Sequence, residues 1–154
     1  ACLVGSEMCI RDTLYSSRGF LSTLQYLSRL EQDCPDDYML NLMMGLSHLH
    51  RSMQRLTASR HYQILHGLRY IYRYYEIRST MYTELERQEA DYNLGRAFHL
   101  LGLVSIAVEN YYKVLNDYAD EKLKKHAAYN LVTIYQESGN TRLANNIMEN
   151  YLSI

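Results

Sequence analysis

The sequence predicts an all-α fold built from stacked helix-turn-helix repeats, and three observations favour it. Two stretches of the chain repeat each other at an offset of 37 residues, so that Gly102 and Ala107 recur as Gly139 and Ala144. Apolar residues recur every three or four positions, as on one face of a helix. Only one proline and seven glycines interrupt the 154 residues, so helix breakers are scarce. A repeat of this length, with small residues between helical patterns, is typical of stacked helix pairs.

The composition is that of one soluble domain. A length of 154 residues is one domain's worth, and 47% hydrophobic residues are enough for a packed core. The formal net charge of −1 points neither to nucleic acid nor to a membrane surface as partner. No apolar run approaches the roughly 18 residues that span a bilayer. The three cysteines offer no disulfide framework, so we expect a reduced, intracellular, soluble protein.

The start of the chain follows neither the helical periodicity nor the repeat. Residues 1–12 resemble a translated sequencing-adaptor tail, and they lack the basic start and long apolar centre of a signal peptide. We therefore treat 1–12 as a non-native tail and exclude it from the fold. The helical repeat domain is then expected to span residues 13–154 and to be the C-terminal end of a longer chain.

The first half of the domain predicts a single helix followed by a helix pair. A helix of about 15 residues has an apolar face formed by Phe20, Leu24, Leu27 and Leu30. It is expected to end before Pro35, which disfavours helical geometry in Cys34. Asp36 or Asp37 then caps a helix whose apolar face is formed by Met39, Leu42, Leu46 and Leu49. Another helix is expected from about residue 58 to 76, with a connector at 78–83.

The second half predicts two further helix pairs with a glycine at each turn. The expected helices span residues 84–101, 103–118, 121–138 and 140–152. Gly102 and Gly139 lie between the helices of each pair, where glycine adopts the left-handed conformation without a clash of Cβ. Asn140 or Thr141 is expected to cap the last helix.

These units resemble tetratricopeptide repeats (TPRs). The consensus positions are occupied by Tyr92, Leu94, Gly95, Phe98, Gly102, Ala107 and Tyr111. The next copy departs from the consensus at two small-residue sites, Val132 and Tyr151, and keeps Tyr129, Leu131, Tyr135, Gly139 and Ala144. Small residues at such sites let paired helices approach closely. The resemblance implies helix pairs stacked into a right-handed superhelix, an α-solenoid, with an insertion between paired helices near residues 54–59.

A narrower resemblance covers nearly all of residues 18–154. It is carried by the segments 44–49, 60–61, 92–103, 128–131, 138–141 and 153–154. In these segments the chain is similar to the C-terminal end of the TPR subunit of transcription factor IIIC. The Arg60-His61 pair and the Ser-Gly-Asn-Thr turn at 138–141 are not required by the repeat itself. These residues therefore indicate this particular family and not tetratricopeptide repeats in general.

This resemblance implies a non-enzymatic, nuclear scaffold in RNA polymerase III transcription. The family's subunit belongs to a multi-subunit factor that recognises internal promoters of tRNA-type genes, and its repeat arrays hold other subunits. We expect other protein subunits as partners, and no cofactor, metal, membrane or small-molecule substrate. The alternatives are a repeat adaptor of another pathway and a module that contacts DNA directly.

The concave surface of such repeats is formed by fixed positions of each first helix. These positions predict a partner-binding groove lined by Glu89, Tyr92, Arg96, His99, His126, Tyr129, Thr133 and Gln136. Chaperone-binding repeats hold a terminal carboxylate with Lys and Asn at two of these positions, which Tyr92 and Arg96 occupy here. Mixed aromatic and polar residues favour a protein segment as the ligand.

The DNA alternative rests on the arginine-rich region 51–78. This region holds six arginines against one acidic residue, Glu76. Arg69 and Arg73 lie one helical turn apart with tyrosines between and around them, and basic residues with aromatics can bind nucleic-acid backbones. The competing interpretation of this basic patch is a solvated helix face or a surface that faces an acidic subunit.

Four histidines in the middle of the chain do not predict a metal site. His48 and His50 point in nearly opposite directions on a helix, and His61 and His66 are five residues apart. Zinc ligands on a helix are usually at i and i+4, so we expect ordinary helix-face histidines. The sequence also lacks a glycine-rich phosphate loop and a nucleophile motif, so no catalytic residues are expected.

Overall fold

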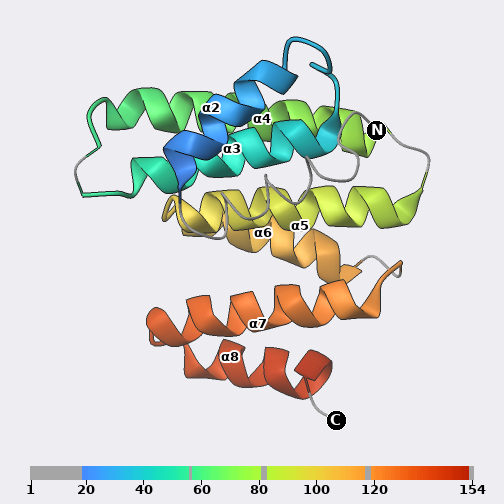
Figure 1. Cartoon of the computed structure of the whole chain (residues 1–154). Helices are drawn as coiled ribbons and strands as arrows, with labels where there is room; N and C mark the ends of the chain where they lie inside the picture. Colours follow the sequence, from blue (N-terminus) through green and yellow to red (C-terminus); the bar gives the residue numbers. More distant parts are fainter. Residues whose placement is uncertain (1–18, 56, 81–82, 117–118, 153–154) are drawn as a thin grey trace. The chain divides into compact units, whose positions relative to one another are not determined.

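Every regular element in the described part of the chain is a helix, as the sequence predicts (Figure 1). The structure is a computed structural model that describes residues 19–55, 57–80, 83–116 and 119–152. The chain divides into two compact units, unit 1 up to Ile77 and unit 2 from Arg78. The tail at 1–12 lies outside the described residues, and the right-handed superhelix stays a prediction.

Unit 1 contains three described helices. They are α2 (Phe20–Leu30), α3 (Tyr38–Ser52) and α4 (Arg60–Ser79), whose last residues belong to unit 2. Asp37, and not Asp36, caps α3, because its side chain accepts a hydrogen bond from the backbone N–H of Leu40 at 2.9 Å. The core between α2 and α3 is formed by Leu24, Leu27, Leu40 and Met44.

The bounds of two helices in unit 1 differ from the prediction. α2 has 11 residues instead of about 15, because the chain turns through residues 31–36 before Asp37 caps the next helix. α4 begins at Arg60, since Ser59 has a φ of 62°, a left-handed conformation that a helix interior does not accept. The helix then continues to Ser79, past the predicted end.

Helices α3 and α4 approach each other closely at two glycines. A Cβ atom built on Gly45 would lie 2.7 Å from Cγ1 of Ile71 and 3.1 Å from the carbonyl oxygen of Gly67. A Cβ atom built on Gly67 would lie 2.5 Å from Cδ2 of Leu49. The two carbon–carbon distances, 2.7 and 2.5 Å, are shorter than carbon atoms in contact allow. The missing side chains therefore let the two backbones pack directly on each other.

Unit 2 is a row of helices in which each packs against the next. The helices are α5 (Glu84–Leu100), α6 (Val104–Asn116), α7 (Glu121–Glu137) and α8 (Thr141–Ile147), followed by the π-helical segment η1 (Met148–Leu152). α5 packs on α6, α6 on α7 and α7 on α8, and α5 also touches α7. This arrangement confirms the predicted helical repeat architecture within the unit.

The two predicted glycine turns are present in unit 2. Gly102 has a φ of +74° and Gly139 a φ of +75°, both left-handed. After each glycine the chain bonds back over the turn, from Leu103 N to the Phe98 carbonyl at 2.9 Å and from Asn140 N to the Tyr135 carbonyl at 2.8 Å. These bonds satisfy carbonyl groups that the helix end leaves free.

The last predicted helix, residues 140–152, is not one regular α-helix. It begins after Asn140, whose side chain caps it by accepting from Leu143 N, and it becomes π-helical at Met148. The side-chain amide of Asn150 donates to the carbonyl oxygen of Asn146 at 2.9 Å. A side chain that bonds a helical carbonyl offers that carbonyl an alternative to the regular backbone ladder.

A buried glutamine that the sequence analysis did not single out connects three helices of unit 2. Gln88 on α5 is completely buried. Its amide N–H donates to the carbonyl oxygen of Val114 on α6 at 3.1 Å, and its amide oxygen accepts from Asp120 N at 2.9 Å. Asp120 is the N-cap of α7, so this one side chain fixes the end of α6 and the start of α7.

The state of one cysteine differs from the expectation. Cys34 is disulfide-bonded in the structure, whereas we expected reduced cysteines. The expectation rested on cysteine number and spacing, which do not say which cysteines come close in space. Cys2 and Cys9 lie outside the described residues. Among the helices that are described, none is long and apolar enough to cross a membrane.

Replacing Ala107 by Leu should lower the stability of unit 2 by roughly 1–3 kcal/mol, since the larger side chain overpacks the α5–α6 contact. Ala107 is completely buried, and one turn later Tyr111 packs against Gly95 of α5. Urea unfolding followed by circular dichroism measures the loss. Ser105→Leu, at an exposed position of α6, is the control that adds the same side chain without burying it. Equal stability of the two variants would show that Ala107 does not hold the helices close.

Candidate partner-binding face

The predicted groove residues form one stripe on each of two helices. We call them the α5/α7 face, which consists of Glu89, Tyr92, Arg96 and His99 on α5 and of His126, Tyr129, Thr133 and Gln136 on α7. On both helices the spacing is three, four and three residues, which places side chains on one side of a helix. The question is then whether the two stripes meet.

Tyr92 is the point at which the two stripes meet. Its ring centroid lies 6.4 Å from that of His126 on α7 and 6.1 Å from that of Tyr111 on α6. Tyr111 is completely buried, and its pKa is raised chiefly by that burial and further by the neighbouring Tyr92. Tyr92, where α5 and α7 meet, therefore packs on Tyr111, a buried and uncharged tyrosine of α6.

The α5 stripe presents one cation, which lies over an aromatic ring. Arg96 is exposed, and its guanidinium carbon lies 5.9 Å from the centroid of the Tyr92 ring, a cation–π distance. His99 is half-buried, with Nδ1 3.3 Å from the hydroxyl of Tyr111. Glu89 does not extend freely into solvent, because it bonds Arg78 at 2.7 Å. Arg96 is thus the presented charge of this stripe.

The α7 stripe presents a large aromatic side chain. Tyr129 is 65% exposed, and His126 and Gln136 are exposed as well. The hydroxyl of Thr133 donates to the carbonyl oxygen of Tyr129 at 3.1 Å, so it is satisfied within its own helix. The structure brings His126 to α5, but it shows no bond from Tyr129, Thr133 or Gln136 to α5 among the residues it describes.

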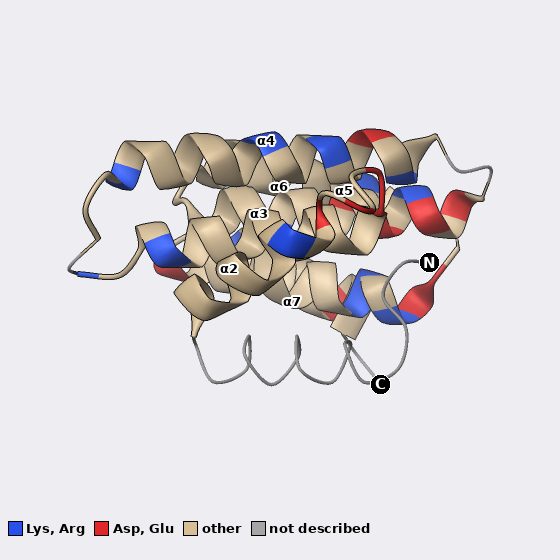
Figure 2. Cartoon of the chain, turned by 45° about the horizontal axis from the view of Figure 1, so that its top comes forward, with Lys and Arg blue, Asp and Glu red and all other residues tan. Residues whose placement is uncertain are grey.

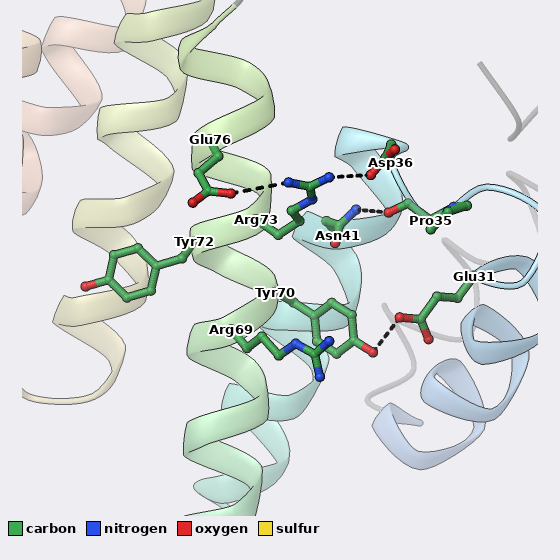
Figure 3. A pocket seen from close by; sticks show the side chains of 9 residues that line it. All are labelled: Glu31, Pro35, Asp36, Asn41, Arg69, Tyr70, Tyr72, Arg73 and Glu76. Atoms are coloured by element: carbon green, nitrogen blue, oxygen red, sulfur yellow. Dashed lines mark hydrogen bonds and ion pairs between the residues drawn. The ribbon is translucent and has the colours of Figure 1, made fainter.

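The basic patch on α4 lies beside a pocket of about 510 Å³ in unit 1 (Figure 3). Arginines recur along α4 (Figure 2), and both Arg69 and Arg73 line the pocket. Arg73 lies between two acids, 2.6 Å from Asp36 and 3.4 Å from Glu76. These bonds, the one to Asp36 first, raise the pKa of Arg73. Arg69 has no acidic partner among the described residues.

Two of the acids at this pocket come from outside the arginine-rich region. Asp36 belongs to the loop before α3, and Glu31 follows α2. Glu31 accepts a hydrogen bond from the hydroxyl of Tyr70 at 2.8 Å. Burial and then this bond raise the pKa of Tyr70 to about 12. The sequence analysis counted acidic residues only within 51–78 and therefore did not include these two acids. The acidic residues around Pro35 could have indicated that the arginines have partners outside that region.

Three histidines of unit 1, His48, His50 and His66, take part in ring packing. Nδ1 of His48 lies 2.8 Å from the side-chain oxygen of Gln63, and its ring stacks on Tyr70 at 5.8 Å between centroids. The ring centroid of His66 lies 5.7 Å from that of His48, and burial lowers the pKa of His48. Within the described ranges, no three His, Cys, Asp or Glu side chains gather as a metal site would require.

Comparison with known proteins gives three informative relatives and no matching family model. Over 141 residues, 92% of this chain, it is 72% identical to the transcription factor tau 131 kDa subunit of Saccharomyces cerevisiae. It is 41% identical to the transcription factor tau subunit sfc4 of Schizosaccharomyces pombe over 88% of the chain. It is 35% identical to general transcription factor 3C polypeptide 3 of Homo sapiens over 78% of the chain.

The matched region is a small part of each relative. The chain spans 14%, 15% and 14% of the yeast, fission yeast and human proteins, respectively. Identity nevertheless extends over most of this chain in all three, which confirms the resemblance that the segments on α3, α5 and α7 indicated. The chain belongs to the family of transcription factor IIIC subunits that includes the tau 131 kDa subunit, sfc4 and general transcription factor 3C polypeptide 3.

Proposed function

We propose that this chain is a non-enzymatic protein–protein interaction scaffold of transcription factor IIIC. In this role it supports assembly of the complex and initiation by RNA polymerase III in the nucleus. The relatives are named as transcription factor subunits, which supports a function in holding other proteins. Helical repeats serve the same purpose elsewhere, because each repeat adds surface to an extended binding face.

The observation that carries the proposal is the exposed aromatic and cationic surface of the α5/α7 face. Tyr129 is 65% exposed, and Arg96 is exposed above Tyr92. Tyr and Arg are the residue types that most often dominate the energy of protein interfaces. Both stripes lie on helices that pack against α6, so the surface is held in shape before a partner arrives.

Direct DNA contact through the arginine-rich region 51–78 is the second candidate function. The positive charge of Arg69, which has no acidic partner among the described residues, favours it. Arg73 contributes less, since Asp36 and Glu76 already compensate its charge. Phosphate contacts make affinity fall steeply with salt, so salt dependence separates this function from the scaffold.

Two double variants of the full-length subunit test the proposal in one pull-down. Tyr92→Ala with Arg96→Ala should release a co-purifying subunit and leave the helical content unchanged, because Arg96 is exposed and Tyr92 is only half-buried. Arg69→Ala with Arg73→Ala is the matched control on α4 and should keep that subunit bound. Exposed ion pairs such as Arg73 with Asp36 contribute little to stability, so the control should stay folded.

The same pull-down, repeated with a DNA competitor and increasing salt, identifies the failure of the proposal. If the arginine pair on α4 alone abolishes binding, and salt or DNA removes the wild-type partner, the DNA function is correct. If neither pair changes the set of co-purifying subunits, the α5/α7 face does not hold a partner.

A further inference from the structure

The charges of the α5/α7 face do not balance, because its acid is already bonded within the unit. Glu89 bonds Arg78 at 2.7 Å, and Arg78 also lies 3.6 Å from Glu86. The side chain of Arg78 is only 13% exposed, so this ion pair is fixed and partly removed from water. Glu89 therefore has little negative charge to offer a ligand.

Three cations on or beside the face have no acidic partner among the described residues. Arg96 lies on the α5 stripe, and Lys122 continues the α7 stripe, four residues before His126. Lys125 lies at the edge of that stripe, four residues before Tyr129. All three are exposed, and the described residues include no acid that pairs with them. Lys124, between the two lysines, differs, since it is buried and bonds Glu121 at 2.9 Å.

The face also includes one acidic residue and exposed apolar surface. One acid, Glu137, lies at the far edge of the α7 stripe, at the end of the helix. Leu85 precedes Glu89 by four residues on the α5 stripe and is 49% exposed. The face thus offers three unpaired cations against one acid, next to the exposed surfaces of Leu85 and Tyr129.

We propose that the α5/α7 face binds an acidic segment of a partner protein, an inference that rests on the scaffold function proposed above. Carboxylates of Asp or Glu in the segment pair with Arg96, Lys122 and Lys125, and apolar side chains between them cover Leu85 and Tyr129. The Arg96 fork is well suited to a carboxylate, because two parallel N–H groups can donate to its two oxygens. Unpaired charge of one sign also steers a partner of opposite charge toward the face.

A protein segment agrees with the face better than a nucleic acid does. Glu137 would lie near a phosphate backbone that extended along the α7 stripe, and like charges disfavour such contact. An acidic peptide can instead place its carboxylates only where the cations are. Binding of DNA to the face is one of the outcomes that the test below distinguishes.

The test uses the full-length subunit and an array of overlapping peptides that covers the other subunits of the complex. Peptides bound by the wild-type subunit should be rich in Asp and Glu. Arg96→Glu should lower the affinity for these peptides roughly tenfold or more, since it places like charge opposite the ligand. Arg142→Glu makes the same change at an exposed position of α8, outside the face, and should leave the affinities unchanged.

Three results would overturn the inference, and they differ in what else they exclude. If bound peptides are neutral or basic and respond to Tyr92→Ala but not to Arg96→Glu, the scaffold function stands and the acidic ligand is wrong. If no bound peptide responds to Tyr92→Ala, Tyr129→Ala or Arg96→Glu, both proposals are wrong. If a DNA duplex competes with the peptides and loses affinity in Arg96→Glu, the ligand of the face is nucleic acid.

Discussion

Replacing Gly67 by Val is expected to destabilise unit 1 by about 3 kcal/mol, the upper end of the usual cost of overpacking. The first added carbon alone would lie 2.5 Å from Cδ2 of Leu49 and 3.2 Å from the carbonyl oxygen of Gly45. Leu49 can change its rotamer, but the backbone of Gly45 cannot move without separating α3 from α4. The two further methyl groups of Val make that separation larger.

A graded series separates this packing effect from helix propensity. Gly67→Ala adds only the first carbon, and the gain of up to about 1 kcal/mol in helix propensity opposes its clash. It should therefore cost much less than Gly67→Val. Leu65→Val, at a position of α4 that is 67% exposed, controls for the β-branched side chain. Hydrogen exchange of peptides from α3 and α4 measures the change, and equal protection in Gly67→Val and Leu65→Val would contradict close backbone packing.

Replacing Gln88 by Met is expected to cost unit 2 about 2–4 kcal/mol, because one buried and one partly buried backbone group lose their partner. Methionine has nearly the same length and fills the same space, so packing is largely kept. The carbonyl oxygen of Val114 and the N–H of Asp120 would each be left without the bond that Gln88 makes. The contact of α5 with the end of α6 and the start of α7 should open first.

The exposed Gln136→Met on α7 is the control for the Gln88 prediction, since it makes the same exchange in water. Hydrogen exchange of the segment around residues 114–122 should increase strongly in Gln88→Met and not in the control. If the two variants show the same protection, the buried amide of Gln88 does not connect these helices, and packing alone holds the unit together.

The elements of the fold could be predicted because their signals are local. Gly102 and Gly139 mark turns by a backbone conformation that other residues rarely adopt, and Asp37 and Asn140 cap helices through bonds only three residues long. Two departures from the prediction also lie at single places in the chain. The positive φ of Ser59 puts the start of α4 at Arg60, and the last helical turn is π-helical, but the residue types at these places are not diagnostic of such conformations.

Contacts between distant residues could not be predicted from a single sequence. Arg73 meets Asp36 at a separation of 37 residues, and Gln88 meets Asp120 at 32. Which residues approach each other depends on how helices pack, and spacing along one helix does not contain that information. For the same reason the sequence predicted the two stripes of the α5/α7 face separately, whereas the contact of Tyr92 with His126 required the structure.

The glycine turns of unit 2 also bear on how the chain acquires its structure. Each turn joins two helices that pack on each other, so most of the first contacts to form connect residues that are near in sequence. Closing such short loops costs little chain entropy, and proteins rich in local contacts fold within microseconds to milliseconds. A nucleus can form at either turn and extend to the neighbouring helix pair. During synthesis, each helix pair can therefore fold soon after it leaves the ribosome, before its partner subunits are present.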